Sequence, residues 1–152
     1  MDFNKITSDL KFLGCTIREL NVVNTVVSLS DEVTKKFGMD VAASEISVSE
    51  KMRSGKLLLK IVVELEENSK NIGSIDLVLE GAFSASISVD EDAFKELLLL
   101  NGATALFSIG RSKIENISAT TFLNGKIIIP MINIYDYYME KQLNATNDNK
   151  QE

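Results

Sequence analysis

The fold of this chain is decided by the stretch from Leu106 to Tyr138, LFSIGRSKIENISATTFLNGKIIIPMINIYDYY. Its first half carries a stripe of small and apolar residues at intervals of four, four, three and four, the spacing of one helix face: Leu106, Gly110, Ile114, Ile117 and Thr121. Asn124-Gly125 predicts the end of this helix. An apolar run and the only proline, Pro130, follow, and Asn133 then predicts the cap of a tyrosine-rich helix. The stretch therefore predicts two helices joined by a stiff crossover.

Four segments before this stretch alternate apolar and polar residues as β-strands do: 13–27, 36–49, 56–66 and 75–89. In the first two segments the apolar positions change parity, near Arg18-Glu19 and after Ala43, which predicts bulges or bends. Gly81 predicts a bend in the fourth. Strands followed by helices, without strand–helix alternation, predict an α+β fold: a four-stranded antiparallel sheet with two main helices packed on one face.

The length of 152 residues predicts one domain, which we place at residues 1–143, with a short helix or arm at its start. The polar residues 144–152 lack aromatics and predict a disordered tail. The first residues have no basic segment followed by an apolar core, so no signal peptide is expected. No run approaches the roughly 20 apolar residues of a membrane helix. We expect a cytoplasmic protein that does not insert into membranes.

The composition excludes several kinds of chemistry. A net charge of −6 without a basic cluster argues against nucleic acid as a partner. The chain has no histidine and one cysteine, which excludes Ser-His-Asp and Cys-His catalysis and zinc sites built from these residues. Asp90-Glu91-Asp92 fits a helix cap better than a metal site, and Cys15 fits a packed strand position. We expect no enzyme activity, no metal and no cofactor.

Tyr135, Tyr137 and Tyr138 point to a binding surface. Three tyrosines within four helical positions cannot all face one core, because neighbours along a helix diverge by roughly 100°. Tyrosine is enriched at interfaces because it joins apolar area to a polar tip. The pattern favours contact with a ligand or another protein, and plain core packing is the alternative.

Three motifs in the second half of the chain resemble those of the SecB-type protein-export chaperones. Gly81-Ala82-Phe83 is similar to the G-x-F at the end of that family's last long strand, and Leu106–Arg111 resembles its L-F-P-x-x-R helix start. Pro130 with Ile132-Asn133-Ile134 resembles its P-V-N-F crossover. Ser108 stands in place of a proline, Pro130 is one position early and Ile134 replaces an aromatic residue. The resemblance therefore indicates a divergent, SecB-like chaperone.

The resemblance implies an ATP-independent holdase, a protein that binds unfolded chains in long apolar grooves without catalysis. It also implies a homotetramer built as a dimer of dimers. The implied groove residues are Phe83, Phe107, Met131, Ile132, Tyr135 and Tyr138. The implied oligomer interface is the helix stripe Leu106, Gly110, Ile114 and Ile117.

The resemblance further implies partners. The clients are unfolded preproteins in export or an antitoxin in a toxin–antitoxin system, and the translocase ATPase SecA docks on the open sheet face. Glu19 and Asp76 fall at two docking positions, whereas Val23 stands where a further acid is expected. The alternative hypothesis is a small-ligand or lipid carrier whose curved sheet closes on the long helix. That function needs a closed apolar cavity.

Overall fold

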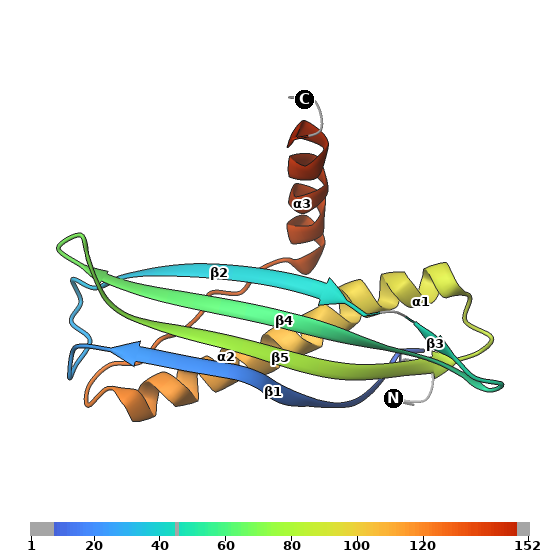
Figure 1. Ribbon diagram of the computed structural model, residues 1–152, viewed down its shortest axis with the longest axis horizontal. Helices are drawn as coiled ribbons and strands as arrows, with labels where there is room; N and C mark the ends of the chain where they lie inside the picture. The colour runs from blue at the N-terminus through green and yellow to red at the C-terminus, as the bar shows by residue number, and fades with distance from the viewer. Residues whose placement is uncertain (1–7, 45, 149–152) are drawn as a thin grey trace, which may run out of the picture.

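The computed structural model describes residues 8–44 and 46–148, with side chains up to Lys141. An antiparallel sheet has the strand order β1-β5-β4-β2, and the short β3 pairs with β4 (Figure 1). The strands are β1 (Lys11–Asn24), β2 (Thr34–Ala43), β3 (Ser47–Val48), β4 (Met52–Glu67) and β5 (Lys70–Ser86). The predicted α+β class and four main strands are confirmed. The segment predicted at 36–49 divides into β2 and β3 where its apolar positions change parity.

A continuous helical run covers one face of the sheet (Figure 1). It consists of α1 (Glu91–Leu97), the π-helical turn η2 (Leu98–Gly102) and α2 (Ala103–Thr121). Asp90 caps its start, because its carboxylate accepts a hydrogen bond from the Ala93 amide at 2.9 Å. A helix end at Asn101-Gly102, which this residue pair suggests, does not occur. Gly102 is helical, and its missing side chain serves packing, since a Cβ there would lie 3.0 Å from Leu57 Cδ1.

The β4–β5 hairpin sets the register of the sheet. Its two-residue turn, Asn68-Ser69, has positive φ at both positions, the conformation that suits the right-handed twist of paired strands. This register places Leu59 opposite Leu79 and Ile61 opposite Leu77, so the apolar residues of both strands share the helix-covered face. In β1 the register shifts between Ile17 and Glu19, which confirms the irregularity predicted at Arg18-Glu19.

Gly81 allows the helix to approach the sheet. A Cβ at this position would lie 2.6 Å from Leu106 Cδ2 and 2.9 Å from Phe83 Cε2, and both of those residues are buried. β5 continues through Gly81 as one curved strand (Figure 1). The glycine predicted to bend this strand therefore also makes room for α2.

The last helix, α3 (Ile134–Asp148), stands out from the sheet beside β2 (Figure 1). Asn133 caps it as predicted, by accepting a hydrogen bond from the Tyr135 amide at 3.0 Å. The predicted tail begins too early, because α3 continues past Asn144 to Asp148. The remaining tail residues, and the first seven of the predicted N-terminal arm, lie outside the described residues. Within the described part, no helix has the length and apolarity needed to cross a membrane.

The packing at Gly81 predicts that Gly81→Ala lowers the free energy of unfolding by about 1–3 kcal/mol, because the added methyl group overpacks a filled contact. Gly38→Ala is the matched control, since its Cβ would meet only Val62 Cβ at 3.7 Å. Alanine at that strand position should be neutral or stabilising. Urea unfolding of both variants measures the difference, and equal stabilities would contradict the role given to Gly81.

Candidate binding groove

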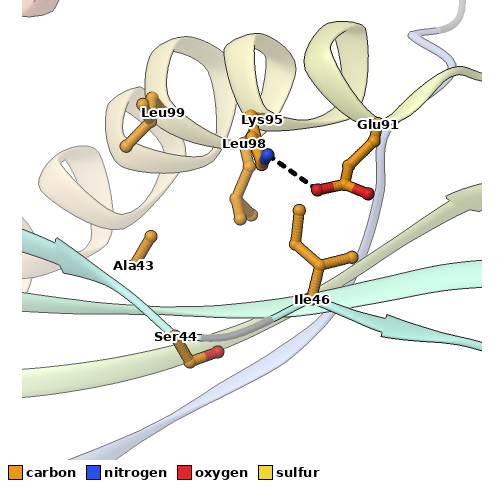
Figure 2. A pocket seen from close by; sticks show the side chains of 7 residues that line it. All are labelled: Ala43, Ser44, Ile46, Glu91, Lys95, Leu98 and Leu99. Carbon is orange, nitrogen blue, oxygen red and sulfur yellow. Dashed lines mark ion pairs between the residues drawn. The ribbon is translucent and has the colours of Figure 1, made fainter.

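An apolar hollow of about 470 Å³ lies between the end of β2 and the helical run. Figure 2 shows Ile46 and Ala43 on the strand side facing Leu98 and Leu99 on the helix side. Glu91 and Lys95 form an ion pair of 2.7 Å beside it. The pair joins two exposed side chains, so it contributes little to stability.

A second hollow of about 320 Å³ lies between the helical run and α3. Its walls are Glu96, Leu99 and Leu100 on one side and residues of α3 on the other: Tyr135, Tyr138 and Met139. Leu99 lines both hollows. We call the two together the groove, which runs from the end of β2, past η2, to α3.

The π-helical turn η2 places consecutive leucines on different surfaces. Leu98 is buried in the core and contributes to the first hollow, whereas Leu99 and Leu100 are half-buried and line the second. A π-helical turn holds more residues than an α-helical turn and is often found at functional sites. Here it supplies the apolar ridge between the two hollows.

The crossover, residues 122–133, runs back along α2 and leads into α3. Ile127 and Ile129 point into the core, whereas Ile128 and Met131 are exposed, Met131 by 83%. Arg111 Nε donates to the Ile129 carbonyl at 2.8 Å. The buried Ser118 hydroxyl accepts from the Ile127 amide at 2.8 Å and donates to a carbonyl within α2. These bonds fix an extended segment whose outer side chains remain open to solvent.

A polar cluster ties α3 to β2. Lys141 Nζ lies 2.5 Å from an Asp40 carboxylate oxygen, and the Tyr137 hydroxyl donates to the same oxygen at 3.2 Å. The hydrogen bond from Lys141 is the main cause that lowers the pKa of Asp40, and the same bond raises the pKa of Lys141. The cluster therefore weakens when pH falls through the titration of Asp40 or rises through that of Lys141. Both side chains are about half exposed, so this attachment is weak.

No protein-family model matches the sequence, and no curated protein matches it. Among solved structures, the chain is similar to a SecB-like chaperone from Mycobacterium tuberculosis, solved in complex with a peptide from an antitoxin. The TM-score is 0.66 at 8% identity, over 81% of this chain and 90% of the other. The chain has the fold of a SecB-like chaperone. A Streptococcus agalactiae protein of unknown function matches with a TM-score of 0.48 and 9% identity, over 80% of this chain and 97% of that one.

Within this SecB-like fold, the predicted groove residues divide into two groups. Tyr135 and Tyr138 line the groove, and Met131 and Ile132 are exposed on the crossover that leads to it. Phe83 and Phe107 do not belong to the groove. Both are buried in the core between the sheet and the helical run, with 1% and 6% of their surfaces exposed.

The predicted oligomer stripe also belongs mainly to the core. Leu106, Gly110 and Ile114 are buried against the chain's own sheet, and Ile117 is half-buried. A Cβ at Gly110 would lie 2.5 Å from Ile61 Cδ1, so this glycine permits close packing within one chain. In this conformation the buried part of the stripe offers no surface to a second subunit.

The structure places Glu19 and Asp76 on the open face of the sheet. Glu19 of β1 lies opposite Val78 of β5. Asp76 is two residues before Val78 on the same strand, so the two acids are diagonal neighbours. Glu19 is exposed and Asp76 is half-buried. This placement agrees with the face on which they were expected.

Several groove residues were not among the sequence candidates: Ala43, Ile46, Glu96, Leu99, Leu100 and Met139. The sequence signal for the helix side of the groove was the run of four consecutive leucines at 97–100. One helix face cannot bury all four, so some of them must lie at the surface. Ala43 and Ile46 gave no local signal, since only the sheet brings them beside η2.

The crossover contact predicts that Ser118→Ala lowers the free energy of unfolding by about 1–3 kcal/mol, because the Ile127 amide is left buried without a partner. Ser112→Ala is the control, since Ser112 is exposed on the same helix. Amide exchange at Ile127 should accelerate in the first variant alone. Unchanged exchange there would contradict the anchoring role of Ser118.

Proposed function

We propose that the protein is an ATP-independent holdase that binds extended apolar segments of non-native polypeptides in the groove. The observation that carries this proposal is the pair of neighbouring apolar hollows that share Leu99 as a wall, with exposed apolar residues on the adjoining crossover. Exposed apolar surface of this kind marks a binding site in a folded protein. The SecB-like fold supports the same function.

The groove suits segments of varied sequence. Leucine, isoleucine, methionine and tyrosine side chains line most of it, and methionine adapts its shape to different partners. Binding would need no nucleotide, metal or covalent step. Among the described residues, no group of three histidine, cysteine or acidic side chains is arranged to hold a metal ion.

Two client classes follow from this proposal. An antitoxin is supported by the SecB-like relative, which was solved with an antitoxin peptide. The second class is unfolded preproteins that the protein would deliver to the translocase ATPase SecA. The position of Glu19 and Asp76 on the open face of the sheet supports this class. Both classes imply a cytoplasmic protein.

The carrier alternative receives less support from the packing. Such a carrier needs a cavity between the sheet and the long helix. That space holds the buried Phe83, Leu106 and Ile114, and the contacts at Gly81 leave no room even for a methyl group. The two hollows of the groove instead lie outside this packed layer.

We also propose that the protein assembles through β1, as part of the tetramer that the resemblance implies. β1 is an edge strand, and Phe12, Ile17 and Leu20 lie opposite core residues of β5 yet are 41–46% exposed. An exposed, apolar edge strand is a template for pairing with another chain. A second copy would cover these side chains and pair the free edge.

The assembly proposal predicts a solution mass of four times the 16.8 kDa chain. Leu20→Lys should shift the protein to a smaller species, because it places a charge in the proposed contact. Leu58→Lys is the control on the open face, where Leu58 is 40% exposed. Light scattering after size-exclusion chromatography measures the masses, and a strictly monomeric wild type would contradict the tetramer.

The holdase proposal predicts that the wild type suppresses aggregation of a chemically denatured client at one tetramer per client. Leu99→Glu and Met139→Glu should weaken client binding at least tenfold, because a buried leucine-sized contact contributes roughly 1.5–3 kcal/mol. Met139 is 43% exposed, so its variant should keep the fold. Leu58→Glu should bind normally. A wild type that slows neither aggregation nor refolding of any unfolded client would rule out this function.

A further inference from the structure

The hydroxyl group of Tyr138 is buried and has no hydrogen-bond partner among the described residues. Its neighbour Tyr137 differs, because that hydroxyl donates to Asp40 at 3.2 Å. The two rings pack edge to face with centroids 5.2 Å apart. A buried hydroxyl without a partner loses its hydrogen bonds to water and gains none in return. Phenylalanine at position 138 would keep the ring contacts without that cost.

The position of Tyr138 suggests why a tyrosine stands there. Its side chain lines the groove opposite Leu99 and Leu100, in a hollow whose walls are mainly apolar apart from Glu96 and Tyr135. Burial raises the pKa of Tyr138 to about 12, so the hydroxyl keeps its proton at neutral pH and remains a donor. The wall of the groove therefore holds a covered hydrogen-bond donor that the described part of the protein does not use.

A non-native segment brings matching groups into an apolar groove. Every residue of an extended chain carries a main-chain carbonyl that loses water when the segment is buried. Main-chain hydrogen bonds do not depend on the client's side chains, so they suit a groove that accepts varied sequences. A protonated donor that is shielded from water in a mainly apolar wall is complementary to such a carbonyl.

We propose that the Tyr138 hydroxyl donates a hydrogen bond to a main-chain carbonyl of the bound segment, so that the groove holds clients partly by their backbone. This inference rests on the proposed holdase function. The hydroxyl is covered in the free protein, and a segment that enters between η2 and α3 uncovers it. The weak attachment of α3 through Asp40 and Lys141 permits this displacement.

The test compares Tyr138→Phe with Tyr137→Phe in the full-length protein. The probe is a permanently unfolded client, reduced and carboxymethylated α-lactalbumin, titrated by fluorescence anisotropy. Tyr138→Phe should raise the dissociation constant about 3–10-fold, the range expected for one hydrogen bond. Its thermal unfolding midpoint should be unchanged or higher. Tyr137→Phe removes one contact between α3 and Asp40, so it should lower the midpoint slightly and should not raise the dissociation constant.

Weaker binding by Tyr138→Phe with an unchanged or higher midpoint supports the proposal. A lower midpoint with unchanged affinity would overturn it, since the hydroxyl would then serve the folded protein alone. A lower midpoint together with weaker binding would also overturn it, because the loss would follow from a damaged groove. If the wild type binds the probe and Tyr138→Phe binds equally well, only this inference fails. If the wild type binds no unfolded client, the holdase function fails with it.

Discussion

The close contact between the helical run and one face of the sheet is the constraint on which the rest of the structure depends. Leu106 packs where Gly81 has no side chain, and Ile61 packs where Gly110 has none. The alternate apolar residues of β4 and β5 that face the helix are fully buried beneath this contact: Leu57, Leu59, Ile61, Val63, Leu65, Ile75, Leu77 and Leu79. Because interiors are packed as densely as organic crystals, a single added carbon at these glycines is felt by its neighbours. The contact fixes both the distance and the direction of α2.

One helical run covers the middle of the sheet and leaves both sides incompletely covered. On the β1 side, Ile17 and Leu20 remain exposed although they lie on the helix-covered face. On the β2 side, the space beside η2 becomes the groove, and α3 supplies its far wall. The surplus of apolar surface therefore follows from the architecture, since one helix layer is narrower than the sheet. We assign the first surface to a second copy and the second to clients.

The sequence predicted the layers well and the site only in part. The alternation of apolar and polar residues from Leu57 to Leu65 predicted a strand with one buried face. A shift of one residue in strand pairing would turn every apolar side chain to the other face, so the pattern allows one register. Asn101-Gly102 suggests a helix end that does not occur, because a glycine that permits close packing and a glycine that ends a helix can follow the same residue in the sequence. Phe83 and Phe107 were assigned to a groove and lie in the core, since an aromatic side chain suits either environment.

The sequence by itself determined the fold class, the strand faces, the β1 irregularity, the cap at Asn133 and the tyrosine cluster at the start of α3. These features depend on neighbours along the chain, whose spacing is visible in one dimension. Only the tertiary structure decided that Leu99 lines two hollows and that Ala43 and Ile46 lie across from η2. It alone separated Tyr137, which is hydrogen-bonded to Asp40, from Tyr138, whose hydroxyl is unpaired within the described chain. Such distinctions depend on contacts between segments distant in sequence, which local pattern does not specify.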